Sequence, residues 1–229
     1  MKKLRTFIRW VIWTIVGLYI TTIVLLHIPV VQGFLAQKVG DIAGNKLGTE
    51  VRVGRIDLGF INRFVLDDIL IYDQSHKKML SASRVGARVD IWHLLRTGEI
   101  NISSAQLFGL RAELYKTSKD AKPNFQFVLD SLASKDTTSH TPLHLSINSL
   151  VIRHGNIKYD CLDAPTTPNR LNLNHINVSD ISSYLILNKL DDTSVWANLR
   201  ALAFKEASGL EVKQLAFELK ANQQQAALR

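Results

Sequence analysis

The sequence predicts a mainly β protein with a membrane-spanning helix at its N-terminus. Two observations indicate this fold class. An uncharged apolar segment long enough to cross a bilayer occupies residues 10–28, and most of the later chain follows the two-residue apolar period of strands. We therefore expect a cytoplasmic tail and transmembrane signal anchor in 1–28, an amphipathic helix in 29–47, and an open, antiparallel, groove-like sheet in 48–229.

The anchor segment contains no Asp, Glu, Lys or Arg, and as a helix it would extend about 28 Å, close to the hydrocarbon thickness of a bilayer. Four basic residues precede it and no charged residue follows before Lys38, which places the N-terminus in the cytoplasm. A cleaved signal peptide is the alternative, but its apolar core usually has only about 7–15 residues. We expect lipid contacts from Trp10, Trp13, Val16, Leu18, Ile20, Val24, Leu25 and Ile28.

Composition narrows the function classes for the part that follows the anchor. The net charge is +8, and the four basic residues before the anchor account for half of it. No concentrated basic run remains, which argues against a nucleic-acid-binding protein. The single cysteine, Cys161, excludes an internal disulfide framework, and we expect it to be a small buried apolar side chain.

Residues 29–47 have the spacing of an amphipathic helix. Pro29 suits a first helical turn, and Gly48 suits the position just after the last one. Its apolar positions are Val31, Phe34, Leu35, Val39 and Ile42. The helix could pack over the open end of the next element or lie on the outer membrane surface, and the absence of a basic polar face favours packing.

From Gly48 onward, apolar residues recur at offsets of 0, 2, 5 and 7. Steps of two are the strand period, and a β-bulge at the step of three would return both halves to one face of a sheet. We expect six such units: Val51, Val53, Ile56 and Leu58; Phe64, Leu66, Ile69 and Ile71; Ile100, Ile102, Ala105 and Leu107; Leu145, Ile147, Leu150 and Ile152; Leu171, Leu173, Ile176 and Val178; Leu210, Val212, Leu215 and Phe217.

Other segments are less regular. We expect strands at 85–91 and 110–114, a turn at 92–99, a short helix at 125–132, a linker near 133–141 and a loop at 161–170. The closing residues carry no stop signal, which indicates a fragment of a longer protein. The few predicted helices cannot cover the apolar face of the predicted sheet. The sheet must therefore close on itself, pack on another sheet or accept an apolar ligand.

The order and spacing of these features resemble the start of the TamB/AsmA-like family. The resemblance lies in the anchor, in GTEVRVGRIDLGFINRFVLDDILIYD with Gly54, in LLRTGEI at 94–100, in Asn124-Phe125, and in INSLVIRHGNIKYD with Gly155 at a turn. It implies a single-pass inner-membrane protein of a Gram-negative envelope whose periplasmic β-taco groove conducts phospholipid to the outer membrane and contributes to outer-membrane biogenesis. Family members are much longer than this chain.

The resemblance also implies which residues contact phospholipid acyl chains. We expect the groove floor to comprise Val51, Val53, Ile56, Leu58, Phe64, Leu66, Ile69, Ile71, Ile100, Ile102, Leu107, Leu145, Ile147, Leu150, Ile152, Leu171, Leu173, Ile176 and Val178. The alternative is that they form the dry core of an ordinary sandwich. The alternative function is an anchored scaffold that recruits an outer-membrane assembly or translocation factor; an assembly barrel would be contacted through a missing C-terminal region.

No pattern predicts catalysis, a cofactor or a metal, so we expect a protein that is not an enzyme. His140 and His144 flank Pro142, so they lack the helical i, i+4 geometry of a zinc site with His154. The G-x-S-x-G, P-loop and H-E-x-x-H motifs are absent.

The charged residues of the predicted sheet have structural explanations. Adjacent acidic pairs on a strand point to opposite faces, so Asp67-Asp68 and Asp191-Asp192 are interpreted as turn or bulge residues. We expect a solvated outer face carrying Arg52, Arg55, Arg84, Arg88 and Lys158.

Overall fold

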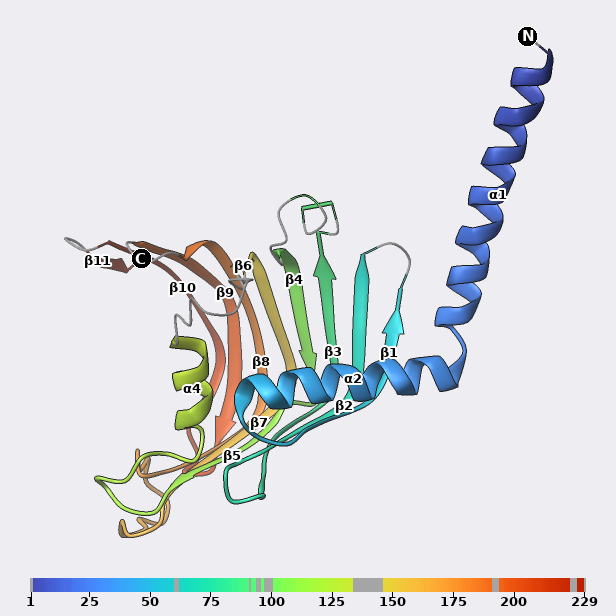
Figure 1. The fold of residues 1–229 in the computed structure, drawn as a ribbon. Coiled ribbons are helices and arrows are strands. Elements are labelled where there is room, and N and C mark those ends of the chain that lie inside the picture. Colours follow the sequence, from blue (N-terminus) through green and yellow to red (C-terminus); the bar gives the residue numbers. More distant parts are fainter. Residues whose placement is uncertain are drawn as a thin grey trace.

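The computed structural model describes residues 2–59, 62–90, 92–93, 96, 101–133, 146–190, 194–222 and 226–228. The chain is mainly β, as predicted, with an N-terminal apolar helix and one large sheet (Figure 1). The helices are α1 (Lys2–Leu26), α2 (Pro29–Leu47) and α4 (Gln126–Ala133). The strands are β1 (Val51–Leu58), β2 (Arg63–Tyr72), β3 (Lys78–Val89), β4 (Asn101–Phe108), β5 (Arg111–Lys116), β6 (Ser146–Ile147), β7 (Ser149–Cys161), β8 (His175–Leu190), β9 (Ser194–Glu206), β10 (Glu211–Asn222) and β11 (Ala226–Leu228).

Helix α1 stands apart from the sheet, and its residues 7–26 form a helix long and apolar enough to cross a membrane. Thr14, Thr21 and Thr22 do not interrupt it, because each hydroxyl donates a 2.9 Å hydrogen bond to the carbonyl four residues earlier. The helix ends at Leu26. The predicted anchor residue Ile28 instead has extended backbone and is the N-cap of α2, which starts and ends where the sequence predicts and is followed by Gly48 at φ 69°.

The sheet is mixed, so the prediction of a wholly antiparallel sheet is wrong. Its order is β1-β2-β3-β4-β7-β8-β9-β10-β11, and β5 also pairs with β3 and β7. Strand β7 runs parallel to β4 and β5, and β6 runs parallel to β4. The physical reason is the long connection between β5 and β7, which includes α4 and lets the chain re-enter the sheet in the same direction.

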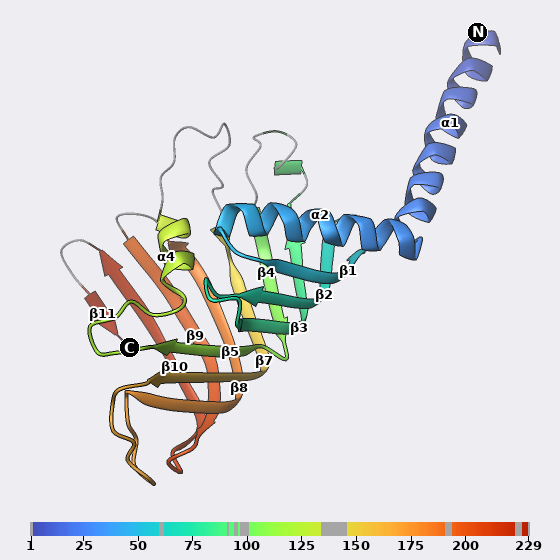
Figure 2. The ribbon, with the colours of Figure 1, turned by 60° about the horizontal axis from the view of Figure 1, so that its bottom comes forward.

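The sheet is bent into two arms (Figure 2). In β2, β7 and β8 a residue other than glycine takes a positive φ within the strand: Asp68 at 54°, His154 at 55° and Asp180 at 54°. The ladder skips a residue or shifts register at each of these places. The interpretation of Asp67-Asp68 as turn or bulge residues is therefore confirmed for Asp68 but wrong for Asp67, which pairs regularly with Arg55 and Arg84. Asp191-Asp192 lie outside the described residues.

Helix α2 packs against β1 through only part of the face that the sequence predicts, since Val31, Leu35 and Val39 are partly covered but Phe34 and Ile42 are not. Its buried residues are Gln32, Ala36 and Gly40, whereas Phe34 is 58% exposed and Ile42 67% exposed. The reason is a close backbone approach: a Cβ at Gly40 would lie 2.8 Å from the Val51 carbonyl oxygen. Only small side chains permit this distance.

The backbone groups that α2 approaches belong to the free edge of β1. The Tyr72 N–H donates to the Glu50 carbonyl, so by antiparallel alternation Val51 and Val53 direct their backbone groups away from β2. Gly40 lies beside these groups. Helix α2 thus covers an edge that would otherwise invite pairing with another strand.

Candidate functional site

Three rows of mainly apolar residues cross the sheet on one face. Cross-strand partners project from the same face, so the ladder register identifies each row. The first row runs through eight strands and contains Leu58, Phe64, Ala87, Ala105, Leu150, Leu185, Leu199 and Phe217. The second, one pleat along, contains Ile56, Leu66, Val85, Leu107, Ile152, Ser183, Leu202 and Leu215.

A third row lies on the other arm of the bent sheet: Val51, Ile71, Leu80, Ala112, Ile157, Val178 and Glu206. Between the arms, the step of three in β1, β2, β3, β7 and β8 and at the β4–β5 connection falls along one line. We call it the bend line, and it contains Gly54, Asp68, Ser83, Gly109, His154 and Asp180. The bulges restore the side-chain direction, so both arms present apolar residues on the same face.

Neighbouring strands approach closely at the bend line. A Cβ at Gly54 would lie 2.9 Å from the Cβ of Asp68, and one at Gly109 would lie 2.6 Å from the Ser83 hydroxyl oxygen. Gly109 also has φ 62° and donates its N–H to the Arg153 carbonyl at 2.9 Å. A glycine there supplies both the left-handed backbone and the space.

The rows are only partly covered. Ile56, Ala105 and Leu199 are buried, but Phe64, Leu66, Leu80, Leu107, Leu150, Ile152, Leu185, Leu202 and Phe217 are of intermediate exposure and Leu215 is exposed. A sealed sandwich core would bury these large side chains almost completely. The face is therefore apolar and partly accessible to solvent.

The opposite face carries charge at the bend line. Arg55, Asp67 and Arg84 are neighbours across β1, β2 and β3, and both guanidinium groups donate to the carboxylate at 2.7 Å. Hydrogen bonds from Arg84 and then Arg55 outweigh burial and hold the pKa of Asp67 below its usual range. The predicted outer-face cations Arg52, Arg55, Arg84, Arg88 and Lys158 are all exposed, so that prediction is confirmed.

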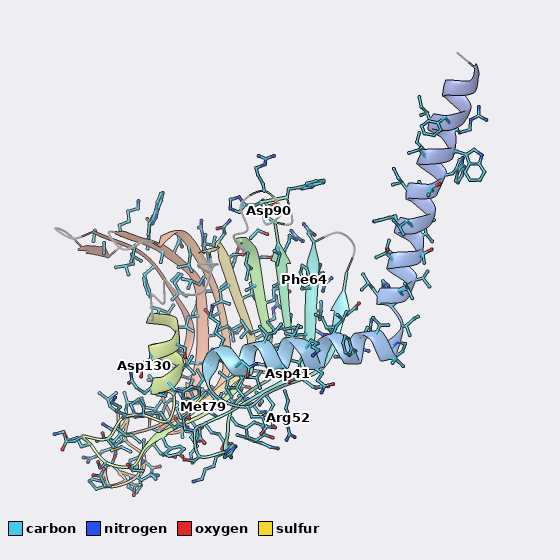
Figure 3. The ribbon with its side chains drawn as sticks, in the orientation of Figure 1. Asp41, Arg52, Phe64, Met79, Asp90 and Asp130 are labelled. Atoms are coloured by element: carbon cyan, nitrogen blue, oxygen red, sulfur yellow. The ribbon has the colours of Figure 1, made fainter. Side chains whose placement is uncertain are left out.

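The far arm is closed by a second polar cluster, around Asp73. This carboxylate is 2% exposed and accepts hydrogen bonds from the N–H groups of Ser75 and Lys77, the Tyr115 hydroxyl and the Asn124 amide. Burial raises the pKa of Asp73, but the four hydrogen bonds together lower it by more. The pKa of Asp73 is therefore below its usual range. The cluster joins the β2–β3 turn to β5 and to the segment before α4, the helix on which Figure 3 labels Asp130.

Beyond the cluster, the end of β7 meets the start of β8. The two ring nitrogens of His175 lie 2.9 Å from the Ala164 carbonyl and 3.1 Å from the Asp160 carboxylate. Because both neighbours accept hydrogen bonds, the backbone carbonyl first and the carboxylate second raise the pKa of His175. Cys161 is buried as predicted, and its thiol lies 3.0 Å from Asp163.

The structure places most predicted floor residues on the apolar face but contradicts two. Leu171 and Leu173 lie outside β8, at 53% and 73% exposure, because Asn172 forms a turn that accepts from the N–H groups of Asn174 and His175. Gly155 is not at a turn between strands but within the continuous strand β7, beside the bulge at His154. Of the rest, Ile100 and Leu145 lie outside the described residues, and for Leu58 and Ile147 only the backbone is described.

Several row residues were missed, although the same offsets identify them. The apolar pattern with offsets 0, 2, 5 and 7 repeats every five residues, at offsets 10 and 12. A four-residue unit that begins five residues later therefore fits the same pattern equally well. In the structure three units begin later than predicted, at Ala105, Leu150 and Ile176, and further ones begin at Leu80 and Ala197. In the units that begin at Leu80, Ala105, Leu150 and Ile176, the step of three falls on the bend line, as it does in β2.

The described residues contain no candidate metal-binding cluster. No three or more His, Cys, Asp or Glu side chains gather there as metal ligands. His154 lies at the bend line, whereas His140 and His144 fall outside the described ranges. The predicted linker near 133–141 and most of the LLRTGEI segment also fall outside them, apart from Ala133, which ends α4, and Arg96.

Comparisons with known proteins identify no family. No protein-family model matches the chain, and no curated protein matches it. The apolar rows, the bend line and the apolar helix α1 are therefore the observations on which a function can be based.

Proposed function

We propose that this chain is a membrane-anchored β-groove protein that holds phospholipid acyl chains against the apolar rows, in the manner of the TamB/AsmA-like family. In this proposal α1 spans the inner membrane with the N-terminus in the cytoplasm, and the sheet lies in the periplasm. The chain contributes to phospholipid transport to the outer membrane and to outer-membrane biogenesis. The observation that carries the proposal is the partly exposed apolar face that crosses eight paired strands.

The dimensions of the rows suit acyl chains. Strands lie about 4.8 Å apart, so a row across eight strands extends about 34 Å. The acyl chains of one leaflet span half of a hydrocarbon core of about 30 Å. A row could therefore lie along two acyl chains placed end to end.

The energetics also suit a conduit rather than a selective site. Each buried methylene contributes about 0.8 kcal/mol, so a dozen contribute about 10 kcal/mol before the cost of association. The rows contain aliphatic and phenyl side chains almost throughout, apart from Ser183 and Glu206. Such a surface binds hydrocarbon without a directional contact, so a lipid can move from one strand pair to the next. Charged headgroups would remain in water.

Photocrosslinking tests the proposal with a matched control. Ile152 lies in the second row, whereas its neighbour Val151 projects from the opposite face, and both are of intermediate exposure. A photoreactive amino acid at Ile152, in full-length chain expressed in a Gram-negative cell, should yield phospholipid adducts by mass spectrometry. The same substitution at Val151 should yield few.

Two results would contradict the proposal. Equal lipid capture at both positions would mean that the label merely reaches membrane, and capture of protein alone at Ile152 would indicate a protein-covered core. The second result would favour the anchored scaffold, in which another protein covers the rows. Ile102, on the same face, provides a second labelling position.

A further inference from the structure

Helix α2 presents two different surfaces, and only one of them faces the sheet. Gln32, Ala36 and Gly40 are buried at intervals of four residues. Val30, Phe34, Lys38 and Ile42, which we call the outward row, are also spaced by four but are offset by two residues, or about 200° around the helix. The outward row therefore lies on the side of α2 opposite β1.

The outward row exposes large apolar side chains. Val30 is 80%, Phe34 58% and Ile42 67% exposed, so the described part of the chain leaves them uncovered. Lys38 lies among them with its ammonium 5.8 Å from the centre of the Phe34 ring. A lysine in such a position can bury its aliphatic stem and extend its charge to a phosphate.

The connection to α1 limits what can lie against this row. Only His27 and Ile28 separate Leu26 from Pro29, so the start of α2 lies within about 11 Å of the end of the apolar helix. The corner is held by hydrogen bonds from Ile28 to Leu25 and from Gln32 to Ile28. The headgroup region on each side of a bilayer is about 5–8 Å thick. If α1 spans the membrane, α2 begins in or beside that region.

We propose that α2 lies in the headgroup region with Val30, Phe34 and Ile42 inserted among the lipids and Lys38 near a phosphate. This inference rests on the proposed anchor. Its consequence is that α2 joins the membrane surface on one side to the edge of β1 on the other, so the apolar rows begin directly at the bilayer. The anchor then does more than tether the sheet, because it sets where an acyl chain would enter.

Depth-dependent fluorescence tests the inference in the full chain reconstituted into phosphatidylethanolamine–phosphatidylglycerol vesicles. An environment-sensitive dye is attached to Phe34→Cys, to Ile42→Cys and, as a control, to Thr166→Cys, each in a Cys161→Ala background with unchanged circular dichroism. Thr166 is exposed in the β7–β8 loop. Dye at the two α2 positions should shift to the blue and lose emission to lipid-borne nitroxides, whereas dye at Thr166 should do neither.

Each other outcome overturns the inference in a recognisable way. If the chain resists alkaline extraction but the α2 dyes behave like the control, α1 is an anchor and α2 does not lie in the headgroup region. If alkaline extraction removes the chain, the anchor in the proposed function fails as well. If the blue shift disappears when the protein is diluted into excess lipid, a second copy of the chain covers the row.

Discussion

Replacing Gly40 by alanine would test how α2 covers the edge of β1. The added methyl group would lie 2.8 Å from the Val51 carbonyl oxygen. To reach an ordinary contact of 3.4 Å, the helix and strand must separate by about 0.6 Å. Overpacking of this kind typically costs about 1–3 kcal/mol in the free energy of unfolding.

Helix propensity acts in the opposite direction and must be removed from the comparison. Alanine is about 1 kcal/mol more favourable than glycine in a helix interior. Gly33 is the matched control, since it lies in the same helix with nothing within 4 Å of an added Cβ. We expect Gly33→Ala to stabilise the chain by up to about 1 kcal/mol, and Gly40→Ala to be less stable than Gly33→Ala by about 1–3 kcal/mol.

Urea unfolding of the full chain in detergent micelles, followed by the circular dichroism of the sheet, measures both variants. Hydrogen exchange at Val53, whose N–H faces the free edge beside Gly40, should also become faster in Gly40→Ala. If the two alanine variants were equally stabilised, α2 would not be packed closely on β1. The account of how the edge is covered would then be wrong.

Three further predictions concern the bend line and the ionisable groups. Asp68 has φ 54°, a backbone conformation that glycine adopts readily and valine does not. In urea unfolding, Asp68→Gly should therefore retain or increase the free energy of unfolding, and Asp68→Val should lower it by about 1–2 kcal/mol. Equal effects of the two substitutions would contradict the bulge. Since the folded-state pKa of Asp67 is lowered, its stabilisation is present above the unfolded pKa of about 4 and is lost as the pH falls through the lower folded value. Asp67→Asn should therefore lose part of the stability at pH 7 and show a weaker acid dependence; an unchanged acid profile would exclude this role. The pKa of His175 is raised, so its stabilisation is complete below the unfolded pKa of about 6.5 and is lost as the pH rises through the folded value. His175→Gln should make the urea midpoint less dependent on pH between about pH 6 and 8. An unchanged pH dependence would contradict this role of His175.

Local signals in the sequence determined the helices and the one-faced character of the strands. An uncharged apolar segment, a proline at the start and a glycine at the end suffice for α1 and α2, because these signals act within a few residues. The steps of two and three likewise predict bulged strands such as β2, since side-chain direction follows from the backbone alone.

Three features were decided only by tertiary structure. The five-residue recurrence of the apolar pattern left the starting point of β7 and β8 open, and pairing between strands selected it. The parallel entry of β7 depends on a long connection whose path no local pattern describes. Helix α2 buries Gly40 rather than Phe34 because a strand edge admits only a small side chain, a requirement set by a neighbour and therefore invisible in the helix sequence itself.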